Sequence, residues 1–328
     1  MKDTSSYKRL ASLLAILGLG ALLLFSTLDE SQRQPATVLP RIEPAAALHL
    51  LPSPETPSPR PFPPIPPVLA QSYLVQIIED HAPLLERDGS RQMRPASLTK
   101  VLTSLLAMQE LDHNAPVVFS AFAKSAGEKE SHVEAGEAFT RNDVIRFAIV
   151  ESANDAAVAL AEAIGRKRGA FSFDDAMLLF KQAANQKARE LGMANSQFEN
   201  STGLDDVGHY TTAQDLFRLV SHVWENYREI WDFSRAGEAD IFSLRKTEYH
   251  IASTNQLLSE FPALMGGKTG LTDAAKGTLI LLYPIKSNRT AVIIVLGSDN
   301  RFEDGRMLIR WLEEAFNENV GIKRPIPS

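Results

Sequence analysis

The sequence contains no cysteine, which excludes disulfide bonds, thiolate nucleophiles and cysteine-ligated metal sites. It also has no long run of lysine or arginine, and its formal net charge is -6. A nucleic acid is therefore not an expected partner, because such partners require a basic surface. The seven histidines form no H-x-x-x-H pattern or comparable cluster, so we expect neither a metal nor another cofactor.

An uncharged, mostly apolar segment occupies residues 10–28, directly after Lys2, Lys8 and Arg9. At about 1.5 Å per residue, a helix of this length just crosses a hydrocarbon core of roughly 30 Å. A basic end followed by an apolar segment directs the remainder of a chain across a membrane. The segment is therefore predicted to be either a transmembrane anchor or a cleaved signal peptide.

We favour the anchor. No small-x-small cleavage signal follows Phe25 directly, and the alanine run at 45–47 lies far from the apolar segment. The flanking positive charge then places residues 1–9 in the cytoplasm and everything beyond Leu28 outside. The expected location is the cell membrane, crossed once, with the folded part on the extracytoplasmic side.

Residues 29–69 form a proline-rich linker, with most of the prolines at 52–59 and 61–67. Proline has no backbone N–H and restricts φ, so such a segment is extended and semi-rigid. We interpret it as a plain tether rather than as a docking motif. It would let the folded part stand some distance from the bilayer.

The folded part is expected at residues 70–320, with a short tail at 321–328. Apolar residues make up 44% of the whole chain, which is enough for a large core in the folded part. Hydrophobic runs predict strands at 73–78, 83–87, 277–283 and 290–296, and helices at 98–111, 141–150, 155–164 and 307–316. Thr140 and Asp143 resemble a capping box, and Gly165 is the expected stop of the third helix. Strands at both ends that share one sheet indicate an α/β (α+β) fold.

The first chemical motif is S-L-T-K at 97–100, at the start of a predicted helix. A spacing of three residues places Ser97 and Lys100 on one face, within reach of each other. A serine hydroxyl needs a base before it becomes a nucleophile, and a desolvated lysine has a pKa low enough to act as that base. Alone, the pattern is a weak signal, because a capping serine with a solvated lysine looks the same.

Two further motifs are also weak when taken singly. S-A-N at 152–154 lies between two predicted helices, where serine and asparagine are common loop and capping residues. K-T-G at 268–270 follows two glycines just before the C-terminal hairpin. Glycines there let a substrate backbone lie against an edge strand, and Lys268 and Thr269 can bind a carboxylate.

The order and separation of the three motifs in one exported chain decide between these interpretations. The sequence resembles the D-alanyl-D-alanine carboxypeptidases, low-molecular-mass penicillin-binding proteins that are related to the serine β-lactamases. The resemblance spans about 72–316 and includes 95–100, 152–157, 203–213 and 266–272. It implies a β-lactamase/transpeptidase-like fold, with an antiparallel sheet flanked by helices and a helical subdomain.

The resemblance also implies an activity. A cell-wall hydrolase of this family removes the terminal D-alanine from peptidoglycan stem peptides, contributes to cell shape and is inhibited by β-lactams. Ser97 would form the acyl-enzyme, with Lys100 as the general base. Ser152 would relay a proton to the leaving D-alanine.

By the same resemblance, the substrate-binding residues are Asn154, Lys268, Thr269, Gly270, Leu271 and Arg301. Asn154 would hold the substrate backbone, while Lys268 and Thr269 would face the terminal carboxylate. The backbone N–H groups of Ser97 and Leu271 would form the oxyanion hole, where one donor contributes roughly 2.7 to 4 kcal/mol.

Three positions need separate comment. Family members often have histidine where this chain has Leu271, which affects specificity more than chemistry because the expected role is a backbone one. Arg301, with Trp311 downstream, fits the spacing of the family's carboxylate-binding arginine. His209 matches a Gly-His-Tyr stretch of the family, and we interpret it as structural because Lys100 already supplies the base.

A D,D-endopeptidase that cuts peptidoglycan crosslinks is the nearest alternative. Many carboxypeptidases carry a β-rich second domain and a C-terminal amphipathic anchor after the catalytic domain, and we expect neither here, as in related endopeptidases. A class A β-lactamase is disfavoured, since no glutamate lies in a loop that would activate the deacylating water. A non-catalytic wall-binding protein is disfavoured because all three motifs are intact.

Overall fold

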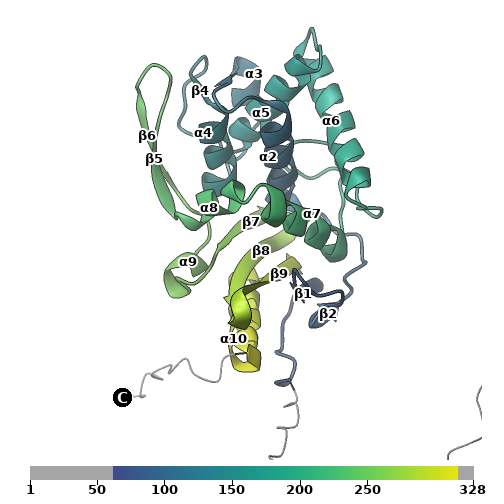
Figure 1. Ribbon diagram of the computed structural model, residues 1–328. Helices are drawn as coiled ribbons and strands as arrows, with labels where there is room; N and C mark the ends of the chain where they lie inside the picture. Colours follow the sequence, from purple (N-terminus) through teal and green to yellow (C-terminus); the bar gives the residue numbers. More distant parts are fainter. Residues whose placement is uncertain (1–61, 317–328) are drawn as a thin grey trace, which may run out of the picture. The chain divides into compact units, whose positions relative to one another are not determined.

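The computed structural model describes residues 62–316 (Figure 1). The segments predicted at 1–9, 10–28 and 321–328, and most of the linker predicted at 29–69, lie outside this range. Of the helices within 62–316, none is sufficiently long and apolar to cross a bilayer.

The last residues of the predicted linker pack against the folded part. The Phe62 ring stacks on Trp311 with a centroid distance of 5.6 Å, and Trp311 Nε1 donates a hydrogen bond to Pro63 O at 3.1 Å. Val68 is buried. Ordered packing therefore begins before residue 70, the boundary expected from composition.

Five strands form one antiparallel sheet in the order β2-β1-β9-β8-β7. Their bounds are β1 Ser72–Ile77, β2 Leu85–Arg87, β7 Gly266–Thr272, β8 Lys276–Ile285 and β9 Arg289–Ser298. Tyr73 of β1 pairs with Val295 of β9, so the two ends of the folded part share the sheet, as predicted. β7 is an edge strand and pairs only with β8, which leaves its outer edge open to a ligand.

The sheet is buried on both faces, which explains why its strands are continuous apolar runs. Along β8, Leu279 and Leu281 belong to a core shared with Leu308 and Trp311, on helix α10 (Arg301–Phe316). The alternate residue Ile280 belongs to a second core shared with the other helices. Successive side chains of a strand point to opposite faces, so α10 covers one face and the helical subdomain covers the other.

The helical subdomain surrounds α2 (Thr99–Glu110), whose residues 99–107 are all buried. The helices around it are α4 Arg141–Arg146, α5 Asn154–Lys167, α6 Phe173–Glu190, α7 Ala213–Asn226 and α8 Glu229–Arg235. Figure 1 shows these helices gathered on the side of the sheet opposite α10. Shorter elements complete the fold: α3 Ala121–Lys124, α9 Leu257–Glu260 and the hairpins β3–β4 (Pro116–Val118, Ala138–Thr140) and β5–β6 (Glu238–Phe242, Glu248–Ala252).

Two predicted helices differ from those observed. The helix predicted at 141–150 begins where expected, with the Thr140 side chain accepting a hydrogen bond from Asp143 N, but it becomes a π-helical turn, η2 (Phe147–Glu151). Gly165 does not stop the third helix. It lies inside α5 at the crossing with α6, where an added Cβ would be 2.4 Å from Ala176 Cα, so glycine serves close packing there.

Candidate active site

Ser97 lies in the short helix η1 (Ala96–Leu98), which continues directly into α2. Ser97 is partly exposed, whereas Lys100 is completely buried. Lys100 Nζ lies 2.8 Å from Ser97 Oγ. The structure therefore brings the predicted nucleophile and the predicted base into hydrogen-bond contact.

The Asn154 side chain, at the start of α5, joins this pair. Its Oδ1 accepts a hydrogen bond from Lys100 Nζ at 2.6 Å. Its Nδ2 donates to Glu128 O at 2.6 Å and to Gly127 O at 3.2 Å. Because carbonyl oxygens only accept hydrogen bonds, these contacts assign the orientation of the Asn154 amide.

The surroundings of Lys100 favour its neutral form. Burial lowers the pKa of Lys100 well below the ordinary value, and the positive charge of Lys129 lowers it further. A neutral amine has two N–H groups and one lone pair. Asn154 Oδ1 and Thr202 O, the latter at 2.8 Å, accept the two N–H groups. The lone pair is therefore directed at Ser97 Oγ, where it can take the hydroxyl proton.

Ser152 and Lys268 form a second buried pair beside the first. Ser152 has a left-handed backbone with φ 66°, at the turn from η2 into α5. Lys268 Nζ donates to Ser152 Oγ at 2.7 Å and to Thr269 O at 2.8 Å. Burial, together with the nearby charges of Lys129 and Arg301, lowers the pKa of Lys268 well below its ordinary value. Since Ser152 Oγ accepts from Lys268, the hydroxyl proton of Ser152 is left for another acceptor.

Gly270 lets the edge strand β7 approach the nucleophile. A Cβ at this position would lie 2.9 Å from Ser97 N and 2.3 Å from Thr278 Oγ1, so no other residue fits without displacement of the backbone. Thr278 Oγ1, on β8, donates to Pro95 O at 3.0 Å and holds η1 against the sheet. K-T-G thus places Ser97 beside the open edge of β7.

Thr269 and Leu271, which flank Gly270 on β7, lie at the same edge of the sheet. Thr269 Oγ1 is 2.5 Å from Thr254 Oγ1, a contact that joins β7 to the segment after β6. The Leu271 side chain is 62% exposed. Its backbone pairs with Gly277 of β8. The side chain of Leu271 therefore adds little to the packing, as expected for a position with a backbone role.

Arg301, the first residue of α10, lies at this end of β7. A Cβ at Gly277, the partner of Leu271, would be 3.0 Å from Arg301 Cβ. The Arg301 guanidinium lies over the Phe302 ring, and its buried Nε has no hydrogen-bond partner within residues 62–316. Its positive charge contributes to the low pKa of Lys268.

Lys129 is a member of the site that no local sequence signal indicated. It lies in the loop after α3, and Lys129 O accepts a hydrogen bond from Asn154 N at 3.0 Å. Burial and the charge of Arg301 lower the pKa of Lys129. Its side chain is exposed to solvent. Thr202 and Thr254 were missed for the same reason, because each reaches the site through tertiary contacts alone.

Comparisons with known proteins agree with this geometry. Residues 62–300 match the family described as D-alanyl-D-alanine carboxypeptidase, peptidase S11. The chain belongs to this family. It is 30% identical over 240 residues to D-alanyl-D-alanine carboxypeptidase DacF of Bacillus subtilis, a match that covers 72% of this chain and 59% of DacF. The chain therefore spans less than two thirds of that relative's length.

Two other similarities bear on fold and activity. A D-alanyl-D-alanine endopeptidase of Pseudomonas aeruginosa is 29% identical over 228 residues, which cover 66% of this chain and 69% of the relative. The crystal structure of an evolved penicillin-binding protein homologue from Mycobacterium tuberculosis superposes with a TM-score of 0.67 at 26% identity, covering 77% of this chain and 94% of that one. The β-lactamase/transpeptidase-like fold implied by the sequence motifs is thereby confirmed.

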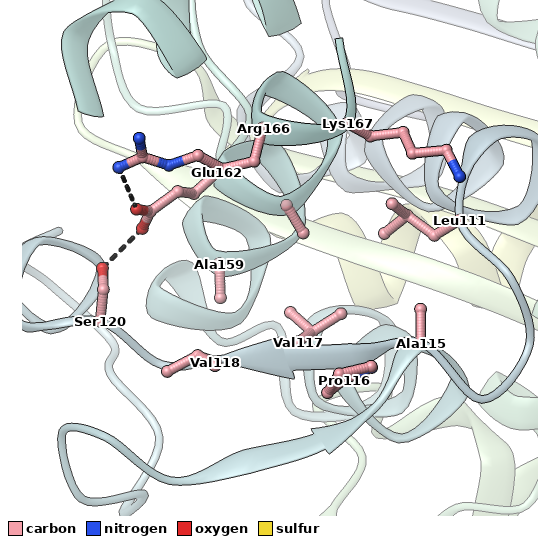
Figure 2. Close-up of a pocket in the computed structure, with 11 residues that line it drawn as sticks. Leu111, Ala115, Pro116, Val117, Val118, Ser120, Ala159, Glu162, Arg166 and Lys167 are labelled. Carbon is pink, nitrogen blue, oxygen red and sulfur yellow. Dashed lines mark hydrogen bonds and ion pairs between the residues drawn. The ribbon is translucent and has the colours of Figure 1, made fainter. Parts of the chain in front are cut away.

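A separate pocket of about 550 Å³ lies between β3 and α5 (Figure 2). Its base is apolar, with Val117 and Ala159, and at its rim Glu162 accepts from Ser120 Oγ at 2.6 Å and pairs with Arg166 at 3.3 Å. Its lining contains none of the predicted site residues. We therefore place the chemistry of this D-alanyl-D-alanine carboxypeptidase family member at Ser97 and not in this pocket.

His209 lies behind the nucleophile and is completely buried. Burial lowers the pKa of His209 to about 4, although Asp206, Glu199 and Asp205 act in the opposite direction. It contacts neither Ser97 nor Lys100 directly, in agreement with the interpretation that it is not the catalytic base.

The buried His209 predicts a pH dependence of stability. As the pH falls below about 6.5, the unfolded chain binds a proton at this residue before the folded chain does, so the free energy of unfolding decreases down to a pH of about 4. The decrease is on the order of 3 kcal/mol. In urea titrations between pH 7 and 4, we expect His209→Gln to lose this part of the slope.

The exposed His250 provides the control. Asp240 raises the pKa of His250, so the wild type gains stability as the pH falls through that pKa. His250→Gln should therefore change the slope in the opposite direction. Equal slopes for wild type and His209→Gln would show that His209 is not held neutral in the folded chain.

Proposed function

We propose that this protein is a serine D-alanyl-D-alanine carboxypeptidase that removes the terminal D-alanine from peptidoglycan stem peptides. One observation carries the proposal. The Nζ of the buried Lys100, whose pKa is lowered by burial, lies 2.8 Å from Ser97 Oγ, beside an edge strand on which a peptide can lie. β-Lactams, which acylate such a serine, are the expected inhibitors, and the biological setting is the cell wall and cell shape.

In the acylation step, Lys100 takes the proton of Ser97 Oγ while this oxygen attacks the carbonyl carbon of the penultimate D-alanine. The carbonyl oxygen becomes negative and accepts hydrogen bonds from the N–H groups of Ser97 and Leu271. The C–N bond then breaks, and Ser152 gives its proton to the leaving nitrogen. Lys268, at 2.7 Å, replaces the proton of Ser152.

Deacylation returns Ser97, Lys100 and the Ser152–Lys268 pair to their initial protonation states. A water molecule attacks the ester carbon and gives its proton to the Ser152–Lys268 pair, which lost one in the first step. Lys100 returns its proton to Ser97 Oγ as the ester C–O bond breaks. The balance is one peptide bond and one water consumed, with D-alanine and a shortened peptide released.

The charge of the cleft supports a substrate with a free carboxylate. The charges of Lys129 and Arg301 lower the pKa of Lys268, and the charge of Arg301 lowers the pKa of Lys129, so the three basic side chains lie near one another. The Lys129 side chain is exposed to solvent, and the buried Nε of Arg301 has no hydrogen-bond partner among residues 62–316. We infer that they approach the terminal carboxylate from the helical side and from the sheet side respectively.

A D,D-endopeptidase activity is the second candidate, and the similarity to the endopeptidase of Pseudomonas aeruginosa favours it. Both reactions use the same acyl-enzyme on Ser97. The products separate them: a carboxypeptidase releases D-alanine from a pentapeptide, whereas an endopeptidase splits a crosslinked dimer into monomers.

We further propose that residues 10–28 tether the protein to the cell membrane, with the catalytic part on the extracytoplasmic side. The uncharged segment after a basic N-terminus supports this, as does the extracytoplasmic location of the proposed substrate.

The acylation chemistry is tested by incubating the full chain with a labelled penicillin, followed by intact mass and peptide mapping. We expect a single adduct on Ser97, none with Ser97→Ala, and an unchanged adduct with the exposed control Ser259→Ala. Lys100→Met should slow acylation by roughly 10²- to 10⁴-fold. An adduct on another residue, or acylation of Ser97→Ala, would contradict the assignment.

The same reaction has a predicted pH profile. Lys100 is active when neutral, hence above its pKa, and that pKa lies well below the value of about 10.4 for a free lysine. The acylation rate should therefore be high near neutral pH and fall on the acid side. A rate that rises steadily to about pH 10 would point to an unshifted lysine.

Lys129→Asn tests the carboxylate contact. Asparagine removes the charge but tolerates the left-handed backbone of position 129, where φ is 54°. With a peptide ending in free D-alanine, KM should rise about tenfold, as for the loss of one contact of about 1.4 kcal/mol. With the C-terminal amide, kcat/KM should be unaffected by the substitution.

Lys246→Asn is the matched control, because Lys246 also has a left-handed backbone, with φ 72°, in the β5–β6 hairpin. It should leave both substrates unaffected. Equal losses for the acid and the amide with Lys129→Asn would exclude a carboxylate contact at this residue.

The tether is tested by the mass of the native protein isolated from membranes. An intact N-terminus, extracted only with detergent, is the expected result. A chain that starts after Ala47 would show that the apolar segment is removed.

A further inference from the structure

Ala96, the residue before the nucleophile, has an unusual backbone. Its φ is 49°, in the left-handed region that residues with a Cβ rarely adopt. Such a conformation costs about 1 to 3 kcal/mol and persists only where the surroundings hold it. Ala96 is completely buried. Its carbonyl group accepts a backbone hydrogen bond from the Thr99 N–H and a second one from a side chain.

A directed chain of hydrogen bonds ends on the Ala96 carbonyl. Thr99 Oγ1 donates to Ala96 O at 3.0 Å and lies 2.9 Å from His209 Nε2. The other ring nitrogen of His209 faces Glu199 N, an N–H donor, at 3.4 Å. In a neutral ring Nδ1 therefore accepts and Nε2 carries the proton. His209 donates to Thr99, and the Thr99 hydroxyl donates to Ala96.

Thr202, whose carbonyl accepts from Lys100, is followed by a turn that packs against the Ala96 carbonyl. Gly203 has a φ of 87°, and an added Cβ would lie 1.8 Å from Ala96 O and 2.9 Å from Thr99 Oγ1. The turn itself is held by Asn200 Oδ1, which accepts from Gly203 N at 2.7 Å. The Ala96 carbonyl thus has little freedom to rotate.

The Ala96–Ser97 peptide bond transmits this orientation to the cleft. It is planar and trans, so its C=O and N–H groups point in opposite directions. With the carbonyl directed at Thr99, the Ser97 N–H faces the side where β7 packs, since a Cβ at Gly270 would lie 2.9 Å from Ser97 N. This N–H is the proposed oxyanion donor.

We propose that His209 is a positioning residue which, through Thr99, fixes the Ala96–Ser97 peptide so that the Ser97 N–H points into the oxyanion hole. The inference rests on the proposed acylation of Ser97. It goes beyond a structural role, because a rotated peptide lowers the rate of the chemical step without weakening the initial binding of a β-lactam or peptide.

The test compares pairs of variants of the full chain that differ in one hydrogen bond. His209→Gln keeps a donor at the position of Nε2, whereas the shorter His209→Asn reaches only the position of Nδ1 and leaves Thr99 without this donor. Thr99→Ser keeps the hydroxyl, and Thr99→Val removes it at nearly constant shape. The half-buried His222 on α7, whose pKa is also lowered by burial, gives the control His222→Asn.

Stopped-flow acylation by a labelled penicillin separates the dissociation constant of the first complex from the acylation rate constant. We expect His209→Asn and Thr99→Val to lower the rate constant about tenfold or more, below the full loss of an oxyanion donor, with little change in the dissociation constant. His209→Gln and Thr99→Ser should restore it. The double variant should be no slower than either single one, because both break the same chain.

If His209→Asn does not fold, as judged by its melting temperature, Thr99→Val decides the question. Wild-type rates in the folded variants would overturn the inference, as would a loss confined to the dissociation constant or a His209→Gln variant as slow as His209→Asn. These results leave the acylation of Ser97 intact. Absence of any adduct in the wild type would instead refute the proposed function, and this inference with it.

Discussion

The site depends on the burial of one amine. Lys100 is completely enclosed, and its nitrogen meets three oxygens from three parts of the chain: Ser97 Oγ, Asn154 Oδ1 and Thr202 O. An ammonium ion there would suffer a large desolvation penalty, which a neutral amine avoids. The packing around α2 thus excludes water from Lys100, and this exclusion favours the neutral amine that can act as a base. Packing and catalysis are two consequences of one arrangement.

The neighbouring cations follow from the same logic. The charges of Lys129 and Arg301 depress the pKa of Lys268, and the charge of Arg301 depresses that of Lys129, which is unfavourable in the absence of an anion. In the proposed function, a substrate carboxylate would relieve this repulsion when it binds. A peptide with a free C-terminus would then gain part of its binding energy from the removal of a cost already present in the protein.

Much of the fold could be predicted, because long apolar runs have few alternatives. The terminal hairpin and a sheet shared by the two ends of the folded part were expected from such runs, and the Thr140 cap was expected from its side chain. Gly165 was misinterpreted because a glycine that allows a helix crossing looks the same locally as one that ends a helix. The helices α6, α7 and α8 and the hairpin β5–β6 were not predicted, since their half-exposed sequences give a weaker signal.

By itself, the sequence determined which groups are the candidates for the proposed chemistry. Ser97 and Lys100 are three residues apart, and a helix brings such neighbours together wherever it lies. Only the tertiary structure decided the state and direction of those groups. The acceptor that turns the Lys100 lone pair is 102 residues away, and the histidine behind Thr99 is 110 residues away. Solvent exclusion and hydrogen bonds across such separations exist only once the chain has folded, so no local pattern encodes them.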